Sequence, residues 1–191
     1  MKNVFVLFSP GTGGNHLANM LSTDSRFIQR STVDDYSTYK KRDAHTSGIK
    51  NLNLSQLELL PSLGNVLCGH FGEYYWLSLS GMLEKFVNRQ IFIIEVPQQG
   101  TLAWERYNDM YPMIDYFFEE QRSLYTMQII EKTFNEHDII SLPCELLFDE
   151  TLSRLFEHIA TQCDLVPNQQ ICKQMHEIWY NKLLHQITEK G

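Results

Sequence analysis

The sequence predicts an α/β fold, a three-layer α/β/α sandwich with a central parallel sheet, and three observations support that prediction. Short apolar runs recur at residues 4–8, 65–69, 90–95 and 137–142. Longer segments with helical spacing of apolar residues separate these runs. Strands that alternate with helices pair in parallel, and the helices pack on the faces of the sheet. With 191 residues, the chain has the size of one domain, spanning residues 1–191.

The first predicted strand and the segment after it are the most informative part of the chain. Residues 4–8 are apolar throughout, as in a strand buried on both faces. The glycine loop (residues 9–15) has the sequence Ser-Pro-Gly-Thr-Gly-Gly-Asn, and residues 16–21 are expected to be helical. Such a loop gathers backbone N–H groups at the positive end of a helix dipole, where phosphate or sulfate binds. The alternative is a tight turn that uses glycine for its geometry alone.

The other elements follow in chain order. Residues 22–50 form a polar excursion and a candidate lid, because long irregular stretches are usually functional or disordered. A short helix is expected at 52–60, and the second strand then delivers His70 at its end. Further helices are predicted at 73–87, 100–109, 113–134, 151–163 and 168–187. The third strand ends at Glu95, and Pro143 stops the fourth.

Three features of the sequence fall at the same edge of the predicted sheet. The glycine loop, His70 and Glu95 all follow the carboxyl ends of strands, which is where parallel sheets bind ligands. The expected anion donors are the backbone N–H groups from Thr12 to His16, with the side chains of Thr12 and Asn15. His70 is a candidate general base, since imidazole titrates near neutral pH. The alternative for His70 is a hydrogen-bonded structural residue.

Several charged or titratable residues near this edge have more than one interpretation. His16 either supplies positive charge or stays neutral and packs against the sheet, because a helix start disfavours its protonation. Glu95 could pair with His70, orient a ligand or accept backbone N–H groups. Arg106 and the basic run at residues 40–42 are cations that could fold over the site. The basic run could equally be a solvated loop.

Composition excludes several classes of function. A net charge of −7 argues against a general nucleic-acid binder. No apolar segment approaches the roughly 20 residues needed to span a bilayer, and the apolar N-terminal run lacks the cleavage site of a signal peptide. The four cysteines have no Cys-x-x-Cys spacing, so neither a metal site nor a disulfide framework is expected. These observations favour a cytoplasmic protein without a membrane partner.

Four stretches, taken in order, match one known pattern. They are residues 9–17 with the glycine loop, Cys68-Gly69-His70-Phe71 at a strand end, residues 91–97 followed by the helix around Trp104 and Arg106, and residues 138–147 with the next helix. Together they resemble the sulfotransferase family, a branch of the P-loop fold. The resemblance spans most of the chain.

This resemblance implies an enzyme that transfers a sulfuryl group from 3′-phosphoadenosine-5′-phosphosulfate to a hydroxyl or amine of a small-molecule or glycan acceptor. Gly11, Thr12, Gly13, Gly14, Asn15 and His16 would hold the 5′-phosphosulfate, and His70 would be the catalytic base. The acceptor and the oligomeric state are not indicated.

The sequence also departs from the family pattern at three positions. Gly11 stands where the family has Lys or Arg, Glu95 where it has the Arg that holds the 3′-phosphate, and Ala103 near its Ser. A second interpretation therefore remains open, a divergent P-loop-like protein that binds a phosphate or sulfate ligand without transferring it. A nucleotide kinase is a third and weaker interpretation, because the Walker lysine is missing.

Overall fold

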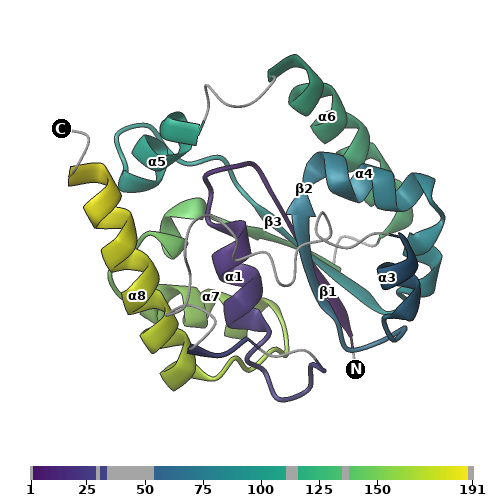
Figure 1. The fold of residues 1–191 in the computed structure, drawn as a ribbon, viewed down its shortest axis with the longest axis horizontal. Helices are drawn as coiled ribbons and strands as arrows, with labels where there is room; N and C mark the ends of the chain where they lie inside the picture. Colours follow the sequence, from purple (N-terminus) through teal and green to yellow (C-terminus); the bar gives the residue numbers. More distant parts are fainter. Residues whose placement is uncertain (1, 29–30, 34–53, 111–115, 135–137, 189–191) are drawn as a thin grey trace.

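The structure is a computed structural model that describes residues 2–28, 31–33, 54–110, 116–134 and 138–188 (Figure 1). Within these residues, four strands form one parallel sheet in the order β2-β1-β3-β4. The strands are β1 (Asn3–Phe8), β2 (Val66–His70), β3 (Arg89–Ile94) and β4 (Ile139–Leu142). The register aligns Phe8 with His70 across β1 and β2, and Leu7 with Ile93 across β1 and β3. The predicted α/β fold with a parallel sheet is confirmed.

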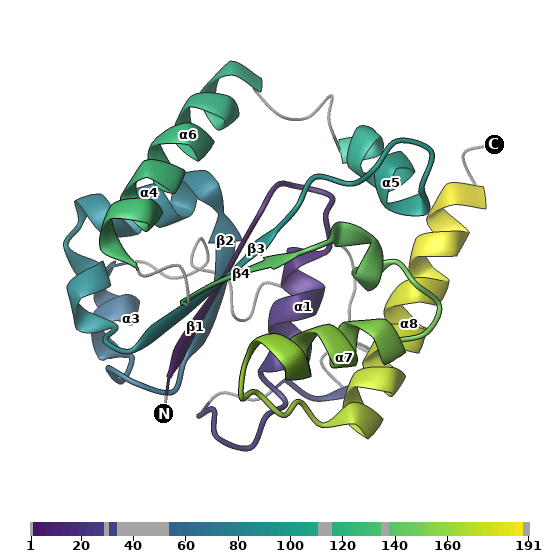
Figure 2. The ribbon, with the colours of Figure 1, turned by 180° about the vertical axis from the view of Figure 1, so that it is seen from behind.

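Helices cover both faces of this sheet, as Figures 1 and 2 show from opposite sides. One face carries α1 (Gly14–Leu21), α7 (Ser153–Gln162) and α8 (Gln169–Thr188). The other carries α3 (Leu54–Leu59), α4 (Phe71–Leu79) and α6 (Tyr116–Thr133). The helix α5 (Leu102–Met110) follows β3, and two 3₁₀ turns span Met82–Lys85 and Cys144–Leu147. This arrangement is that of a three-layer α/β/α fold.

Side chains along β1 alternate between the two faces of the sheet, so this one strand contributes to the hydrophobic core on each face. All six residues of β1 are buried. Val4, Val6 and Phe8 pack on the α1, α7 and α8 side, whereas Phe5 and Leu7 pack on the α3, α4 and α6 side. Because both faces of the central strands are covered, continuous apolar runs are the expected pattern, and the sequence shows it.

The order in which the strands are added to the sheet reverses between β1 and β3. The connection after β1 leads to β2 on one side, and the connection after β3 leads to β4 on the other side. Adjacent strands whose connections diverge leave a crevice beyond their carboxyl ends, and α/β sheets bind ligands there. The glycine loop follows β1 at this edge of the sheet.

The predicted helix at 73–87 is wrong in its extent. The helix α4 starts at Phe71 and ends at Leu79, and a separate 3₁₀ turn follows from Met82. The break falls at Gly81, whose φ of 72° lies in the left-handed region and cannot continue a helix. Leu83 and Phe86 are still buried, as expected, so the apolar spacing reflected the core rather than one continuous helix.

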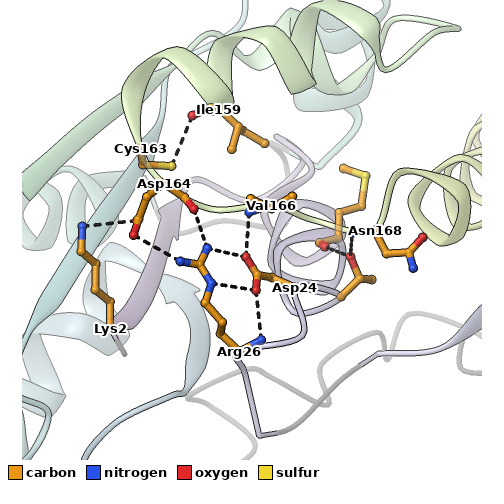
Figure 3. Close-up of polar contacts among 10 residues, drawn as sticks. Lys2, Asp24, Arg26, Ile159, Cys163, Asp164, Val166 and Asn168 are labelled. Carbon is orange, nitrogen blue, oxygen red and sulfur yellow. Dashed lines mark hydrogen bonds and ion pairs between the residues drawn. The ribbon is translucent and has the colours of Figure 1, made fainter.

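Some residues in the first part of the predicted polar excursion are packed against the rest of the domain. Residues 22–28 and 31–33 are described, whereas 29–30 and 34–50 lie outside the described residues. Asp24 is 2% exposed, and it accepts hydrogen bonds from the Arg26 side chain and from the Val166 backbone N–H (Figure 3). Arg26 also bonds Asp164, which lies 3.5 Å from Lys2. These contacts tie the turn after α1 to the connection between α7 and α8, at the end of the sheet opposite the glycine loop.

Candidate functional site

The glycine loop is held in shape by its own residues. Gly11 and Gly13 have φ values of 88° and 83°, a region that costs residues with a Cβ atom. Thr12 lies between them and is fully buried, with its backbone N–H and its Oγ1 hydroxyl both donating to the Ser9 carbonyl, at 3.3 and 2.7 Å. The Thr12 hydroxyl, predicted as an anion donor, is therefore directed into the turn.

Gly14 sets how closely α1 approaches β1. A Cβ atom at this position would lie 2.0 Å from the Phe8 ring, far inside contact distance. Gly13 packs against the segment after β4, where an added Cβ would meet Leu147 at 3.3 Å and Phe148 at 3.5 Å. The Cys144 thiol donates to the Thr12 carbonyl from the same segment, at 3.4 Å. The loop is thus seated between the end of β1 and the residues that follow β4.

The start of α1 has no negatively charged group of its own to offset the helix dipole. Gly13 is the N-cap residue, no side chain caps the helix, and its first turn contains no acidic residue. The first amides of a helix have no carbonyl partner within the helix, so this end carries partial positive charge. By comparison, α4 has Glu73 and α5 has Glu105 in the first turn. Those two helix starts already carry their own negative charge, whereas α7, like α1, has neither a side-chain cap nor an acidic residue in its first turn.

Asn15 is oriented by a neighbour on β2. The Cys68 thiol donates to Asn15 Oδ1 at 3.2 Å, and Cys68 is fully buried while Asn15 is half-buried. This bond assigns the amide oxygen to Cys68 and leaves the Asn15 NH₂ group as a donor. Asn15 is therefore suited to bind an acceptor such as a phosphate or sulfate oxygen.

His70 ends β2 beside the last residue of β1. Its ring packs edge-on against Phe8, with ring centroids 5.0 Å apart, and its side chain is 21% exposed. Its backbone N–H donates to the Glu73 carboxylate, and its Nδ1 lies 3.9 Å from Glu73 Oε1. Cys68 packs on the α1 side of the sheet, and His70, two residues later on the same strand, points to that side too. The structure therefore brings His70, Asn15 and the start of α1 to one face of one edge.

His16 is a packed residue on α1 that faces α8. It is 2% exposed, its ring is stacked on Trp179 with centroids 4.3 Å apart, and its Nε2 lies 3.0 Å from His176 Nδ1. His176 Nε2 in turn lies 2.7 Å from the Asp149 carbonyl oxygen. Burial, with a smaller contribution from His176, lowers the pKa of His16 well below its usual value. Burial also lowers the pKa of His176.

The direction of the hydrogen bonds in this pair follows from these contacts. A carbonyl oxygen can only accept, so His176 Nε2 carries a proton, and the Nδ1 of the neutral ring accepts from His16 Nε2. His16 is a packed residue, as one of its two interpretations had it, but it packs against α8 and not against the sheet. The side chain of His16 does not supply the positive charge that Gly11 lacks, and its backbone N–H remains part of the predicted anion loop.

Glu95 lies at the predicted edge but on the other face of the sheet. Its carboxylate accepts a hydrogen bond of 2.5 Å from the Ser141 hydroxyl. Ser141 is aligned with Ile93, which packs on the α3, α4 and α6 side. Glu95 thus pairs with Ser141 rather than with His70, and its charge faces away from the start of α1.

The candidate cations, Arg106 and residues 40–42, are not placed at the start of α1 by any described contact. Arg106 lies on α5 with a half-buried side chain, and α5 packs against the 3₁₀ turn at Cys144–Leu147 that supports the glycine loop. The basic run at residues 40–42 lies outside the described residues. Ala103 is fully buried in the core.

Two supporting residues were not identified from the sequence. Glu73 stands three residues after His70, the spacing at which a glutamate reaches back to the N-cap N–H, so its role was readable in principle. Cys68 belongs to the same strand end as His70, yet its bond to Asn15 depends on how α1 crosses β2. No local pattern indicates the pairing of His16 with His176, which are 160 residues apart.

Within the described ranges, no helix combines the length and the apolar character needed to cross a bilayer. The same residues contain no group of three or more His, Cys, Asp and Glu side chains placed to hold a metal ion. Comparison of the chain with protein-family models, curated proteins and solved structures finds no match.

Proposed function

We propose that this protein binds a phosphate or sulfate ester of a small molecule at the start of α1. The observation that carries the proposal is the uncapped helix start, which follows the left-handed Gly13 at the reversal between β1 and β3 and has no acidic residue in its first turn. The backbone N–H groups of Gly14, Asn15 and His16 and the amide of Asn15 would bind the oxyanion. His70 would face the group that the ester carries.

The experiment is a calorimetric titration with adenosine 3′,5′-bisphosphate, a sugar phosphate, a sulfated sugar and inorganic phosphate. Binding of at least one ester is expected, and Asn15→Asp should weaken it at least about tenfold, because like charges about 4 Å apart repel by several kcal/mol near a protein surface. The same variant should not destabilise the protein, since an acidic residue in the first turn favours the helix.

The control adds the same charge elsewhere. Asn181 is exposed on α8, and Asn181→Asp should leave the affinity unchanged. If none of the four ligands binds at millimolar concentration, or if both variants lose affinity equally, the proposal is wrong.

A second candidate function is sulfuryl transfer from 3′-phosphoadenosine-5′-phosphosulfate to a hydroxyl or amine acceptor. The specific observation in its favour is the position of His70 on the same face as Asn15 and the start of α1. A base at this point could take the proton of an acceptor as its oxygen or nitrogen attacks the sulfur. The position of Glu95 on the other face lessens its conflict with a bound anion.

This second function requires its own assay. Incubation with the phosphosulfate nucleotide and a panel of small-molecule and glycan acceptors should release adenosine 3′,5′-bisphosphate only when an acceptor is present. Binding of that bisphosphate without any turnover would leave the protein as a ligand-binding module, which is the alternative that Gly11 favours.

A further inference from the structure

Glu73 uses its two carboxylate oxygens in two different ways. Oε2 accepts the backbone N–H of His70, which is the residue before α4 begins. Oε1 lies 3.9 Å from Nδ1 of the His70 ring. The first contact is ordinary helix capping and would be made whatever residue preceded the helix. The second exists because that residue is a histidine.

The surroundings restrict the His70 ring further. Phe8 packs edge-on against it at an interplanar angle of 82°, so the ring is fixed between an aromatic wall and a carboxylate. His70 and Glu73 are 21% and 22% exposed, so water only partly screens their interaction. A separation of 3.9 Å is longer than a hydrogen bond, and catalytic contacts often have such distances before a ligand binds.

We propose that Glu73 is a positioning residue that holds the Nδ1–H of His70 toward its carboxylate, so that His70 Nε2 presents its lone pair to the acceptor group. This inference rests on the second candidate function above. In that reaction, His70 Nε2 takes the proton of the acceptor O–H or N–H, and a bond forms between the acceptor atom and sulfur. The bond from sulfur to the bridging oxygen breaks, and its electron pair leaves with adenosine 3′,5′-bisphosphate. Glu73 then faces the imidazolium that results.

The test is the substitution Glu73→Gln, which removes the charge but keeps an oxygen that can accept the His70 backbone N–H. The readout is the ¹⁵N spectrum of the His70 ring, assigned by comparison with His70→Gln, at a pH where the ring is neutral. In the unsubstituted protein, Nε2 should resonate as an unprotonated nitrogen. In Glu73→Gln, its resonance should shift toward that of a protonated nitrogen, whereas a purely structural cap would leave it unchanged.

Two further variants complete the test. Glu73→Asp keeps a carboxylate and should restore part of the native spectrum. Glu84→Gln removes the same charge from an exposed position and should not alter it. With an active acceptor, Glu73→Gln should slow transfer by about tenfold or more, while the Kd of the bisphosphate changes by less than about twofold.

The outcomes separate this inference from the function on which it rests. Identical His70 spectra in the unsubstituted protein and in Glu73→Gln would overturn the role of Glu73. Failure of the nucleotide to bind, with the expected spectral change present, would overturn sulfuryl transfer and leave the orientation of His70 by Glu73 intact. A spectrum that changes in Glu73→Gln and stays close to the native one in Glu73→Asp would support the carboxylate as the orienting group.

Discussion

Replacing Gly14 by alanine tests the fit between α1 and β1 on which the candidate site depends. The new methyl group would lie 2.0 Å from the Phe8 ring, so the helix and the strand must separate by about 1 Å or more. Crowding of this kind costs about 3 kcal/mol. Alanine restricts the unfolded chain and returns up to about 1 kcal/mol, because the φ of Gly14 is not in the left-handed region. The net loss of unfolding free energy is expected to be about 2 kcal/mol.

The assay is urea denaturation followed by tryptophan fluorescence, with Gly81→Ala as the control. Gly81 has a φ of 72° and no atom within 4 Å of an added Cβ, so its substitution carries a backbone cost without crowding. That cost is about 1–2 kcal/mol. The two glycines thereby separate steric fit from backbone conformation.

A double-mutant cycle identifies the neighbour responsible. Phe8→Ala removes the ring that the new methyl group would meet, so Gly14→Ala should cost at least about 1 kcal/mol less in the Phe8→Ala background. A Gly14→Ala variant within about 0.5 kcal/mol of the original protein would refute the reasoning, as would additivity of the two substitutions.

Two further predictions concern buried titratable groups. Since burial lowers the pKa of His16 and His176 in the folded state, the unfolded state takes up more protons below about pH 6.5. The stability present above that pH should therefore fall as the pH drops, by up to about 1.4 kcal/mol per pH unit for each histidine, in denaturation curves measured from pH 7.5 to 5. Burial alone would raise the pKa of Asp24, but hydrogen bonds from Arg26 and Val166 lower it to about 2. Asp24→Asn should cost about 2 kcal/mol at pH 7 in urea denaturation, and the stability that the carboxylate provides should be lost as the pH falls from about 3.8 through 2.

Each of these predictions has a matched control. His185 is exposed on the same helix as His176, and His185→Gln should keep the pH dependence that His16→Gln reduces. The Asp164 side chain is 63% exposed, so Asp164→Asn should cost less than about 1 kcal/mol. Equal losses for Asp24→Asn and Asp164→Asn would contradict the importance of burial.

The strands were predictable because buried strands consist of short runs of apolar residues. A strand covered on both faces must be apolar at successive positions, and such runs are easy to recognise. The observed ends of β1 and β3 lie within one residue of the predicted ends. The helix at 73–87 was extended too far because Met82, Leu83 and Phe86 continue the apolar spacing after Gly81 has turned the chain. The spacing of apolar residues indicates which side chains are buried, but it does not show whether they belong to one continuous helix.

The edge that carries the candidate site was predictable, and its division between two faces was not. The loop, His70 and Glu95 follow strand ends, so topology alone places them together. The faces that they occupy depend on register, which aligns Ser141 with Ile93 and sends Glu95 to the side opposite α1. The partners of His16 required α8 to be placed first, because no local signal relates residues so distant in the chain.

The contact between α1 and α8 has a consequence for the order of events during synthesis. The glycine loop is synthesised before α8, yet the helix that it starts packs on His176 and Trp179, which are made some 160 residues later. Such a long-range contact can form only after both segments have been made, and closing the loop between them costs chain entropy. The proposed anion site would therefore lack this packing in nascent chains without α8, and a bound ligand would not act as an early folding template.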